Sequence, residues 1–169
     1  MRGKQKQPDL TGPILGIATA WQYWAEVAQP SVFSYLETPT PRTAFGACMA
    51  LWHLYDWVKA EQISGHELIL SSPNVAVLRD VITWGKHREV GNSKGNIREV
   101  TEELDGMRLM MAPGFPPITE HLVKFTVEFQ DKRIARLEDV VINAYLDWRM
   151  FFDRKLGSLP ELAGKVLPG

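Results

Sequence analysis

Residues 41–62, PRTAFGACMALWHLYDWVKAEQ, carry a strong helical pattern. Thr40 suits the N-cap of this helix, and Pro41 suits its first turn, where no backbone N–H is needed. Apolar residues recur at spacings of three and four, and they form two neighbouring stripes: Phe45, Met49 and Trp52 in one, and Ala44, Cys48, Leu51, Tyr55 and Val58 in the other. A helix that is apolar on much of its circumference packs in the interior, so the stretch predicts a central helix.

Three further helices are predicted around this one. The first begins near Pro13 and is interrupted at Pro30; its stripe comprises Ile14, Ile17, Trp21, Trp24, Ala25 and Ala28. The next holds residues 77–90, VLRDVITWGKHREV, with Ser72 or Asn74 as the N-cap. The last lies within residues 133–156, and its buried stripe comprises Leu137, Val141, Ala144, Tyr145, Trp148 and Phe152.

Between the third and fourth helices the pattern changes to that of β-strands. Residues 98–104 and 107–112 are predicted to form a hairpin around Asp105–Gly106, a favoured two-residue turn. Residues 121–129 alternate apolar and polar side chains, as a half-buried strand does. The predicted fold is therefore mainly α: an antiparallel bundle of about four helices with a small antiparallel β insertion, about residues 97–135, before the last helix.

Length and composition indicate one globular domain. The chain has 169 residues, and we expect a flexible N-terminal arm at 1–12, a single helical domain with a β-hairpin insertion at 13–157, and a C-terminal tail at 158–169. The net charge is −1, from 19 Lys and Arg against 20 Asp and Glu, which argues against a general polyanion-coating protein. With one cysteine and no predicted membrane span, a cytoplasmic location is expected.

Familiar catalytic and phosphate-binding motifs are absent from the sequence, and neither a metal site nor a cofactor is predicted. Cys48 lies among apolar residues of a helix, where a buried, inert thiol is expected. His53 and Asp56 are three residues apart on the same helix, hence on one face, where the carboxylate could orient the imidazole. The same spacing also occurs in a polar strip facing solvent.

The third helix offers the strongest candidate for chemistry. Arg79, Thr83, Lys86 and His87 fall on one side of it. An arginine and a histidine on one face suit a metal-independent ribonuclease, in which histidine transfers protons and arginine or lysine stabilises the charge on the phosphate. The alternative is a cationic helix end, because Lys, His and Arg near a C-terminus interact favourably with the helix dipole.

The order of these features resembles the HEPN superfamily. A helix with a His–Asp pair near DW precedes a helix that ends in KH, and strands and a last helix with another DW follow. The HEPN signature is an Arg, four to six residues, then a His; here seven residues separate Arg79 from His87, and Asp80 supplies the usual polar residue after the Arg. The resemblance implies a helical homodimer and a metal-independent RNase of toxin–antitoxin or phage-defence type. Arg79 and His87 would be catalytic, Lys86 would contact phosphate, and His53 and Asp56 would support them.

Two other functions remain open on the residues alone. The Met-bearing segment 107–115, MRLMMAPGF, could be an exposed apolar edge that adds to a partner's sheet, as in an antitoxin, adaptor or inhibitor, or it could pack on the protein's own helices. A ligand-sensing pocket between helices, lined by Trp52, Trp57 and Trp84, is the third hypothesis. The expected partners are thus RNA or another protein, and no membrane.

Overall fold

The computed structural model describes residues 16–86, 97–111 and 117–156. It is mainly helical, with a small antiparallel sheet before the last helix, as predicted. The sheet has three strands in the order β1-β2-β3. In chain order the elements are α1 (Ala20–Tyr23), the π-helical turn η1 (Trp24–Ala28), α2 (Gln29–Glu37), α3 (Pro41–Ala60), α4 (His66–Leu70), α5 (Pro73–Lys86), β1 (Ile97–Met110), β2 (Ile118–Phe129), β3 (Ile134–Arg136) and α6 (Leu137–Leu156).

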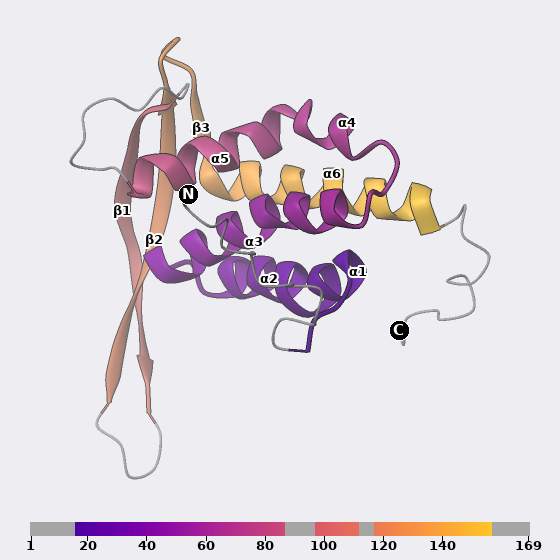
Figure 1. Ribbon diagram of the computed structural model, residues 1–169. Helices are drawn as coiled ribbons and strands as arrows, with labels where there is room; N and C mark the ends of the chain where they lie inside the picture. Colours follow the sequence, from indigo (N-terminus) through magenta and orange to yellow (C-terminus); the bar gives the residue numbers. More distant parts are fainter. Residues whose placement is uncertain (1–15, 87–96, 112–116, 157–169) are drawn as a thin grey trace, which may run out of the picture.

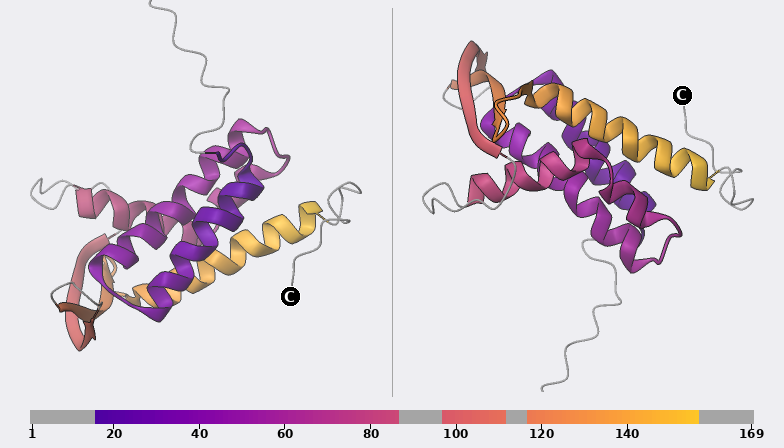
Figure 2. Two further views of the ribbon diagram at one scale, coloured as in Figure 1. Left: turned by 90° about the horizontal axis from the view of Figure 1, so that it is seen from below. Right: turned by 90° about the horizontal axis from the view of Figure 1, so that it is seen from above.

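Helix α3 occupies the centre, as its sequence predicts. It contacts α1, η1, α2, α4, α5 and α6, and its residues Cys48, Leu51 and Leu54 are completely buried. The sheet lies across one end of the helices, where α5 ends and α6 begins (Figures 1 and 2). One continuous core joins the helices to the inner face of the sheet at Val127 and Phe129. Within the described ranges, every helix falls short of the combined length and apolar character that a bilayer crossing requires.

The N-terminal helical segment differs from the prediction at its start and at Pro30. Helix α1 begins at Ala20, where the Thr19 side chain accepts a hydrogen bond from the Gln22 backbone, rather than near Pro13, which lies outside the described residues. Pro30 does not interrupt the segment, because η1 directly precedes it and the Gln29 N–H pairs with the Trp24 carbonyl, five residues back. A proline ring clashes with the carbonyl four residues earlier in a regular α-helix, and a π-helical turn is one of the few local changes that accommodate such an interruption.

Two predicted helix starts are confirmed by their caps. Thr40 accepts from the backbone N–H of Thr43 at 3.2 Å, and the Thr43 hydroxyl accepts from the Thr40 N–H at 2.9 Å, with Pro41 in the first turn. This reciprocal pair satisfies donors that the start of a helix otherwise leaves open. For α5, Ser72 is the cap: its hydroxyl accepts from the Val75 N–H at 3.3 Å.

The hairpin predicted around Asp105–Gly106 is wrong. β1 runs through these residues without turning and pairs with β2 from Ile97↔Phe129 to Met110↔Ile118. The register shifts by one residue between Leu104 and Gly106, so Asp105 is the extra residue of a β-bulge. The local turn preference of Asp105–Gly106 is outweighed by the pairing of β1 with β2, a strand that has a buried apolar face. The connection between the strands lies at 112–116, outside the described residues.

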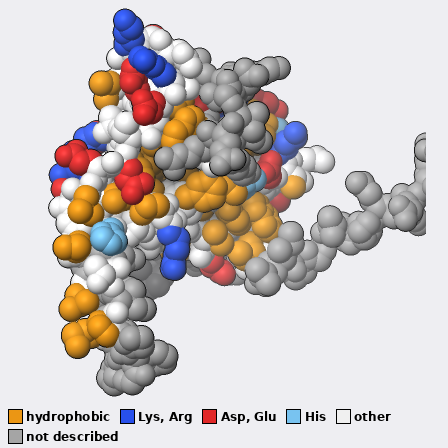
Figure 3. Space-filling view, turned by 90° about the vertical axis from the view of Figure 1, so that its left-hand side faces the viewer, with side chains coloured by type: hydrophobic (Ala, Val, Ile, Leu, Met, Phe, Trp, Pro, Cys, Tyr) orange, Lys and Arg blue, Asp and Glu red, His pale blue; other side chains and the backbone are white. Residues whose placement is uncertain are grey.

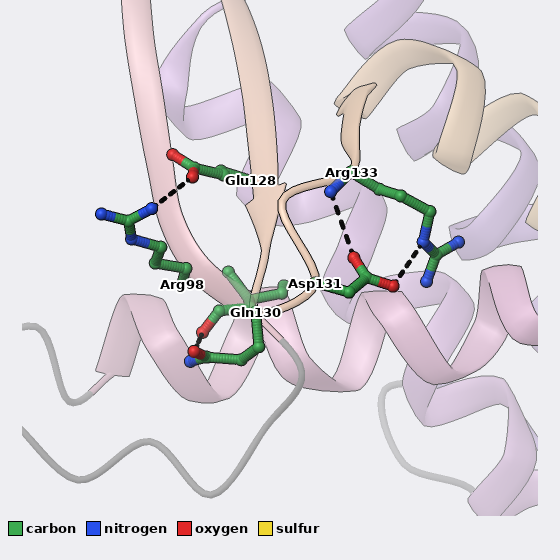
Figure 4. A network of polar contacts seen from close by, with 6 residues as sticks. Arg98, Glu128, Gln130, Asp131 and Arg133 are labelled. Atoms are coloured by element: carbon green, nitrogen blue, oxygen red, sulfur yellow. Dashed lines mark hydrogen bonds and ion pairs between the residues drawn. The ribbon is translucent and has the colours of Figure 1, made fainter.

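A short third strand was also missed by the sequence reasoning, which extended the last helix back over residues 134–136. These residues pair with Thr126–Glu128 of β2, and α6 begins only at Leu137. The predicted turn at 131–133 is present. The Asp131 carboxylate accepts from the backbone and the guanidinium of Arg133, and Gln130 donates to the Ile97 carbonyl (Figure 4). These bonds hold the helix-proximal end of the sheet together.

Candidate functional site

The β1–β2 pair extends past the helices as a two-stranded ribbon (Figure 1). It is attached to the helical part at one backbone bond, in which the Val123 N–H donates to the Pro39 carbonyl at 2.7 Å. Pro39 lies in the turn between α2 and α3, and Val123 lies opposite Leu104, beside the Asp105 bulge. A bulge interrupts the ladder and increases the local twist. The ribbon beyond this bond, which we call the arm, therefore leaves the helices at a defined position.

An apolar stripe runs along one face of the arm. Directly paired residues of an antiparallel ladder share a face, and the pairs here are Leu104↔Val123, Met107↔His121 and Leu109↔Thr119. Val123 is only 3% exposed, but Leu104, Met107 and Leu109 are 59%, 67% and 61% exposed. We call these three residues the arm stripe. The face that packs on the helices at Val127 thus continues outward, and there no helix or strand among the described residues covers it.

A groove lies between the arm and the C-terminal end of α5. It encloses a volume of about 610 Å³, and its lining includes Trp84, Val100, Leu104, His121, Val123 and Phe125. Figure 3 shows apolar side chains gathered on this side of the molecule, beside the sheet and again toward the far end of the ribbon. Leu104 belongs to both the groove and the arm stripe, so the apolar part of the groove lining is continuous with the stripe.

The edge strand β1 is strongly acidic. Glu99, Glu102 and Glu103 form no ion pair with any residue that the structure describes, and Glu99 and Glu102 also line the groove. The neighbouring cations are already engaged: Arg98 pairs with Glu128 at 2.7 Å (Figure 4), and Lys124 pairs with Asp105. Sequence reasoning missed this acidic edge, although the run EVTEEL at 99–104 is its signal.

Arg79, a predicted catalytic residue, is bound to its neighbour in sequence. Its guanidinium is 53% exposed and lies 3.0 Å from the carboxylate of Asp80, which is only 6% exposed. Both side chains lie on α5. The arginine therefore balances a buried negative charge, which is a structural role. Any catalytic role of Arg79 would be in addition to it.

His53 and Asp56 form the predicted pair on one face of α3. The His53 Nδ1 atom lies 2.9 Å from the Asp56 carboxylate, and both side chains reach solvent. This pair and the Arg79–Asp80 pair each form within a single helix. Lys86 is the last residue of α5; its side chain and all of His87 lie outside what the structure describes. The approach of Arg79 to His87 thus stays a prediction.

The three tryptophans proposed to line one pocket have different surroundings. Trp57 stacks on Tyr23 at 5.3 Å between ring centres, and Trp52 stacks on Tyr55 at 6.4 Å. Trp84 instead lines the groove beside the sheet, whose described lining includes neither of the others. The three tryptophans thus contact different neighbours.

Cys48 is buried, as predicted, and burial raises the pKa of its thiol to about 12. A thiol that is protonated and inaccessible at neutral pH is a poor nucleophile. Among residues 16–86, 97–111 and 117–156, no three His, Cys, Asp or Glu side chains gather in a way that could hold a metal ion.

Comparison of the chain with family models, curated proteins and solved structures found no significant match. The HEPN resemblance therefore depends on the order of the sequence features and on the short Arg79–His87 pattern.

Proposed function

We propose that this protein is a non-enzymatic interaction module that binds another protein through its arm. One observation carries the proposal: Leu104, Met107 and Leu109 form an apolar stripe that is exposed where the arm extends past the helices. Contiguous exposed apolar surface on a soluble protein often marks an interaction site. The arm presents this surface on a regular ladder, which lowers the conformational entropy lost on binding.

The charge of this region favours a protein over RNA as the partner. Glu99, Glu102 and Glu103 lie on the strand that carries the arm stripe, and the nearby Arg98 and Lys124 are already paired. Nucleic-acid affinity depends on cations that neutralise phosphates and release their counterions. An acidic edge beside apolar side chains repels phosphate and suits a partner with apolar anchors and positive charge.

The test uses the double variant Met107→Lys/Leu109→Lys. The tagged protein is expressed in its native host and isolated under mild conditions, and any co-purifying protein is identified, produced separately and titrated against the pure chain. We expect the wild type to bind the reconstituted partner, and the variant to bind at least about tenfold more weakly, since two central apolar anchors are worth over 1.4 kcal/mol.

The matched control is Leu146→Lys/Met150→Lys, which places the same charges on exposed apolar positions of α6. It is expected to leave binding unchanged. Both variants alter exposed side chains, so circular dichroism and thermal unfolding are expected to match those of the wild type. A partner that binds the arm variant as tightly as the wild type would refute the proposal.

A second candidate is the HEPN-like, metal-independent RNase of toxin or phage-defence type. It is favoured by the half-exposed guanidinium of Arg79, which Asp80 holds in place on the helix that leads to Lys86 and His87. In this function Arg79 and His87 act on the phosphodiester, Lys86 contacts phosphate, and His53 and Asp56 support the site. The test compares RNA cleavage and growth arrest by the wild type and His87→Ala. Equal behaviour of the two proteins excludes catalysis by this pair.

Both proposed functions share the same architecture and the same cellular location. We infer that α2, α3, α5 and α6 form an antiparallel bundle that serves as the rigid support of the site, and that the protein acts in the cytoplasm. A homodimer belongs to the RNase proposal, in which two sites would line one cleft.

A further inference from the structure

We propose that the outer edge of β1 binds an extended segment of a different protein, in which apolar residues alternate with Lys or Arg. This inference specifies the partner of the interaction module and rests on that proposed function. It uses three features of one strand in the described part of the chain: a backbone edge that no other strand pairs with, a groove with apolar side chains in its lining, and carboxylates that form no ion pair.

The backbone edge comes from the order of the sheet. In the order β1-β2-β3, β1 is an outer strand, and β2 is its partner along the whole length from Ile97 to Met110. Every second N–H and C=O of such a strand points away from its partner. An extended peptide can bond to these groups as an additional strand.

The inner face of β1 offers apolar contacts to such a peptide. Val100 and Leu104 share this face, because they pair with Val127 and Val123, and both line the groove beside Trp84. Every second side chain of an added strand would point to this face. Apolar residues at those positions would cover the groove and the beginning of the arm stripe.

The outer face of β1 offers negative charge. Glu99 and Glu103 pair across the ladder with Glu128 and Lys124, on the face that alternates with Val100 and Leu104; Glu99 also borders the groove, and Glu103 does not. Arg98 is already bound to Glu128, and Lys124 is already bound to Asp105. Neither cation therefore neutralises Glu99 or Glu103. The intervening residues of an added strand would therefore meet carboxylates, which favours Lys or Arg. Glu102, on the inner rim, adds to the negative potential.

The same charges argue against a second copy of this chain along residues 99–103. A second β1 would bring Glu99, Glu102 and Glu103 to the same edge, and like charges opposite each other destabilise a strand pair. Protein interfaces discriminate between partners through such repulsion as well as through attraction. A heterologous basic segment has no such conflict.

The experiment titrates the full chain into a fluorescein-labelled probe and follows fluorescence anisotropy. The probe is a peptide of ten alternating Val and Lys residues, acetylated and amidated at its ends. One comparison peptide replaces Lys by Glu, and a second is the Val–Lys peptide with alternate backbone amides N-methylated on the bonding edge. We expect the Val–Lys peptide to bind at least about tenfold more tightly than either one.

The decisive variant is Glu99→Gln/Glu103→Gln, and the matched control is Glu26→Gln/Glu37→Gln, two exposed carboxylates on η1 and α2. Exposed ion pairs each contribute modestly, so the first variant is expected to weaken binding of the Val–Lys peptide about 3- to 10-fold. The control is expected to leave it unchanged. Equal weakening by both variants, or equal binding of the N-methylated peptide, would show general charge attraction and overturn the inference.

Two further measurements test RNA and a second copy of this chain as alternative occupants of the β1 edge. Tighter binding of a ten-nucleotide RNA than of the Val–Lys peptide would overturn the inference, as would a dimer in sedimentation velocity that Glu99→Gln/Glu103→Gln changes. A failure of the β1-edge inference can be distinguished from a failure of the proposed interaction function. If a natural partner is lost with Met107→Lys/Leu109→Lys but the Val–Lys peptide does not bind the wild type, only the edge inference is wrong.

Discussion

The backbone N–H of Val123 donates to the carbonyl oxygen of Pro39 across 2.7 Å, which joins the sheet to the turn between α2 and α3. This bond lies beside the Asp105 bulge, where the ladder between β1 and β2 is interrupted. On one side of it the inner face of the sheet is buried against the helices. On the other side the same face is exposed as the arm stripe.

Gly106 provides a direct test of the bulge. A glycine in the favoured hairpin turn has positive φ, and replacing it by alanine would cost about 1 kcal/mol or more. Gly106 is instead in strand β1, it is not among the described glycines with positive φ, and an added Cβ would lie 3.9 Å from Leu122, an ordinary contact. We therefore expect Gly106→Ala to change the free energy of unfolding by less than about 0.5 kcal/mol.

The control for this measurement is Gly65→Ala. Gly65 has a φ of 79°, which an alanine adopts only with strain. Urea unfolding of both variants is expected to show a loss of about 1 kcal/mol at Gly65 alone. A larger loss at Gly106 than at Gly65 would support the turn and contradict the continuous strand.

Thr40 is expected to stabilise the central helix measurably. Its side chain caps α3 and is buried, and its backbone N–H is bonded in turn to the Thr43 hydroxyl. Thr40→Ala is expected to lower the free energy of unfolding by about 1–2 kcal/mol, the range for a lost N-cap. Thr119→Ala, an exposed strand position, is the control. Equal effects of the two substitutions in urea unfolding would show that the cap contributes nothing.

Arg79→Ala is expected to destabilise the protein as well as to test catalysis. The substitution removes the guanidinium that lies 3.0 Å from the nearly buried Asp80 carboxylate, and a buried charge that loses such a partner is destabilised. Because Arg79 is half exposed, we expect a loss of about 1–2 kcal/mol rather than the larger values of fully buried pairs. The double variant Arg79→Ala/Asp80→Asn is expected to recover part of it. No change in the thermal midpoint of Arg79→Ala would contradict a structural role of the pair.

Cys48 is expected to make stability decrease at high pH. Burial raises the pKa of the folded thiol to about 12 from its ordinary value of 9.0, so the unfolded chain loses this proton first as the pH rises. The stabilisation is complete below about pH 9 and is lost between pH 9 and 12, with a slope of about 1.4 kcal/mol per pH unit.

The measurement compares wild type with Cys48→Ala, because other groups also titrate in this range. The free energy of unfolding of the wild type is expected to fall more steeply between pH 9 and 10.5 than that of the variant. Parallel pH profiles would show that the thiol is not protected from ionisation. A thiol reagent is likewise expected to modify Cys48 only after the protein unfolds.

The candidate sites were predictable only where they depend on residues close in sequence. The His53–Asp56 pair follows from helical spacing, and it is present. The pairing of Arg79 with Asp80 could not be predicted, because it depends on the burial of Asp80 against other elements. The groove could not be predicted either, since it joins Trp84 to side chains of a sheet far along the chain.

The sequence by itself determined the mainly helical class, the central helix, its start at Thr40, and a further helix start at Ser72 or Asn74, because periodicity and capping are local properties of the chain. Tertiary structure decided the course of β1. The pair Asp105–Gly106 fits a hairpin turn locally, yet the non-local ladder with β2 buries Val123 and Val127 and turns the pair into a bulge. Burial of a distant apolar face outweighed a local turn preference, and the arm with its exposed stripe is the consequence.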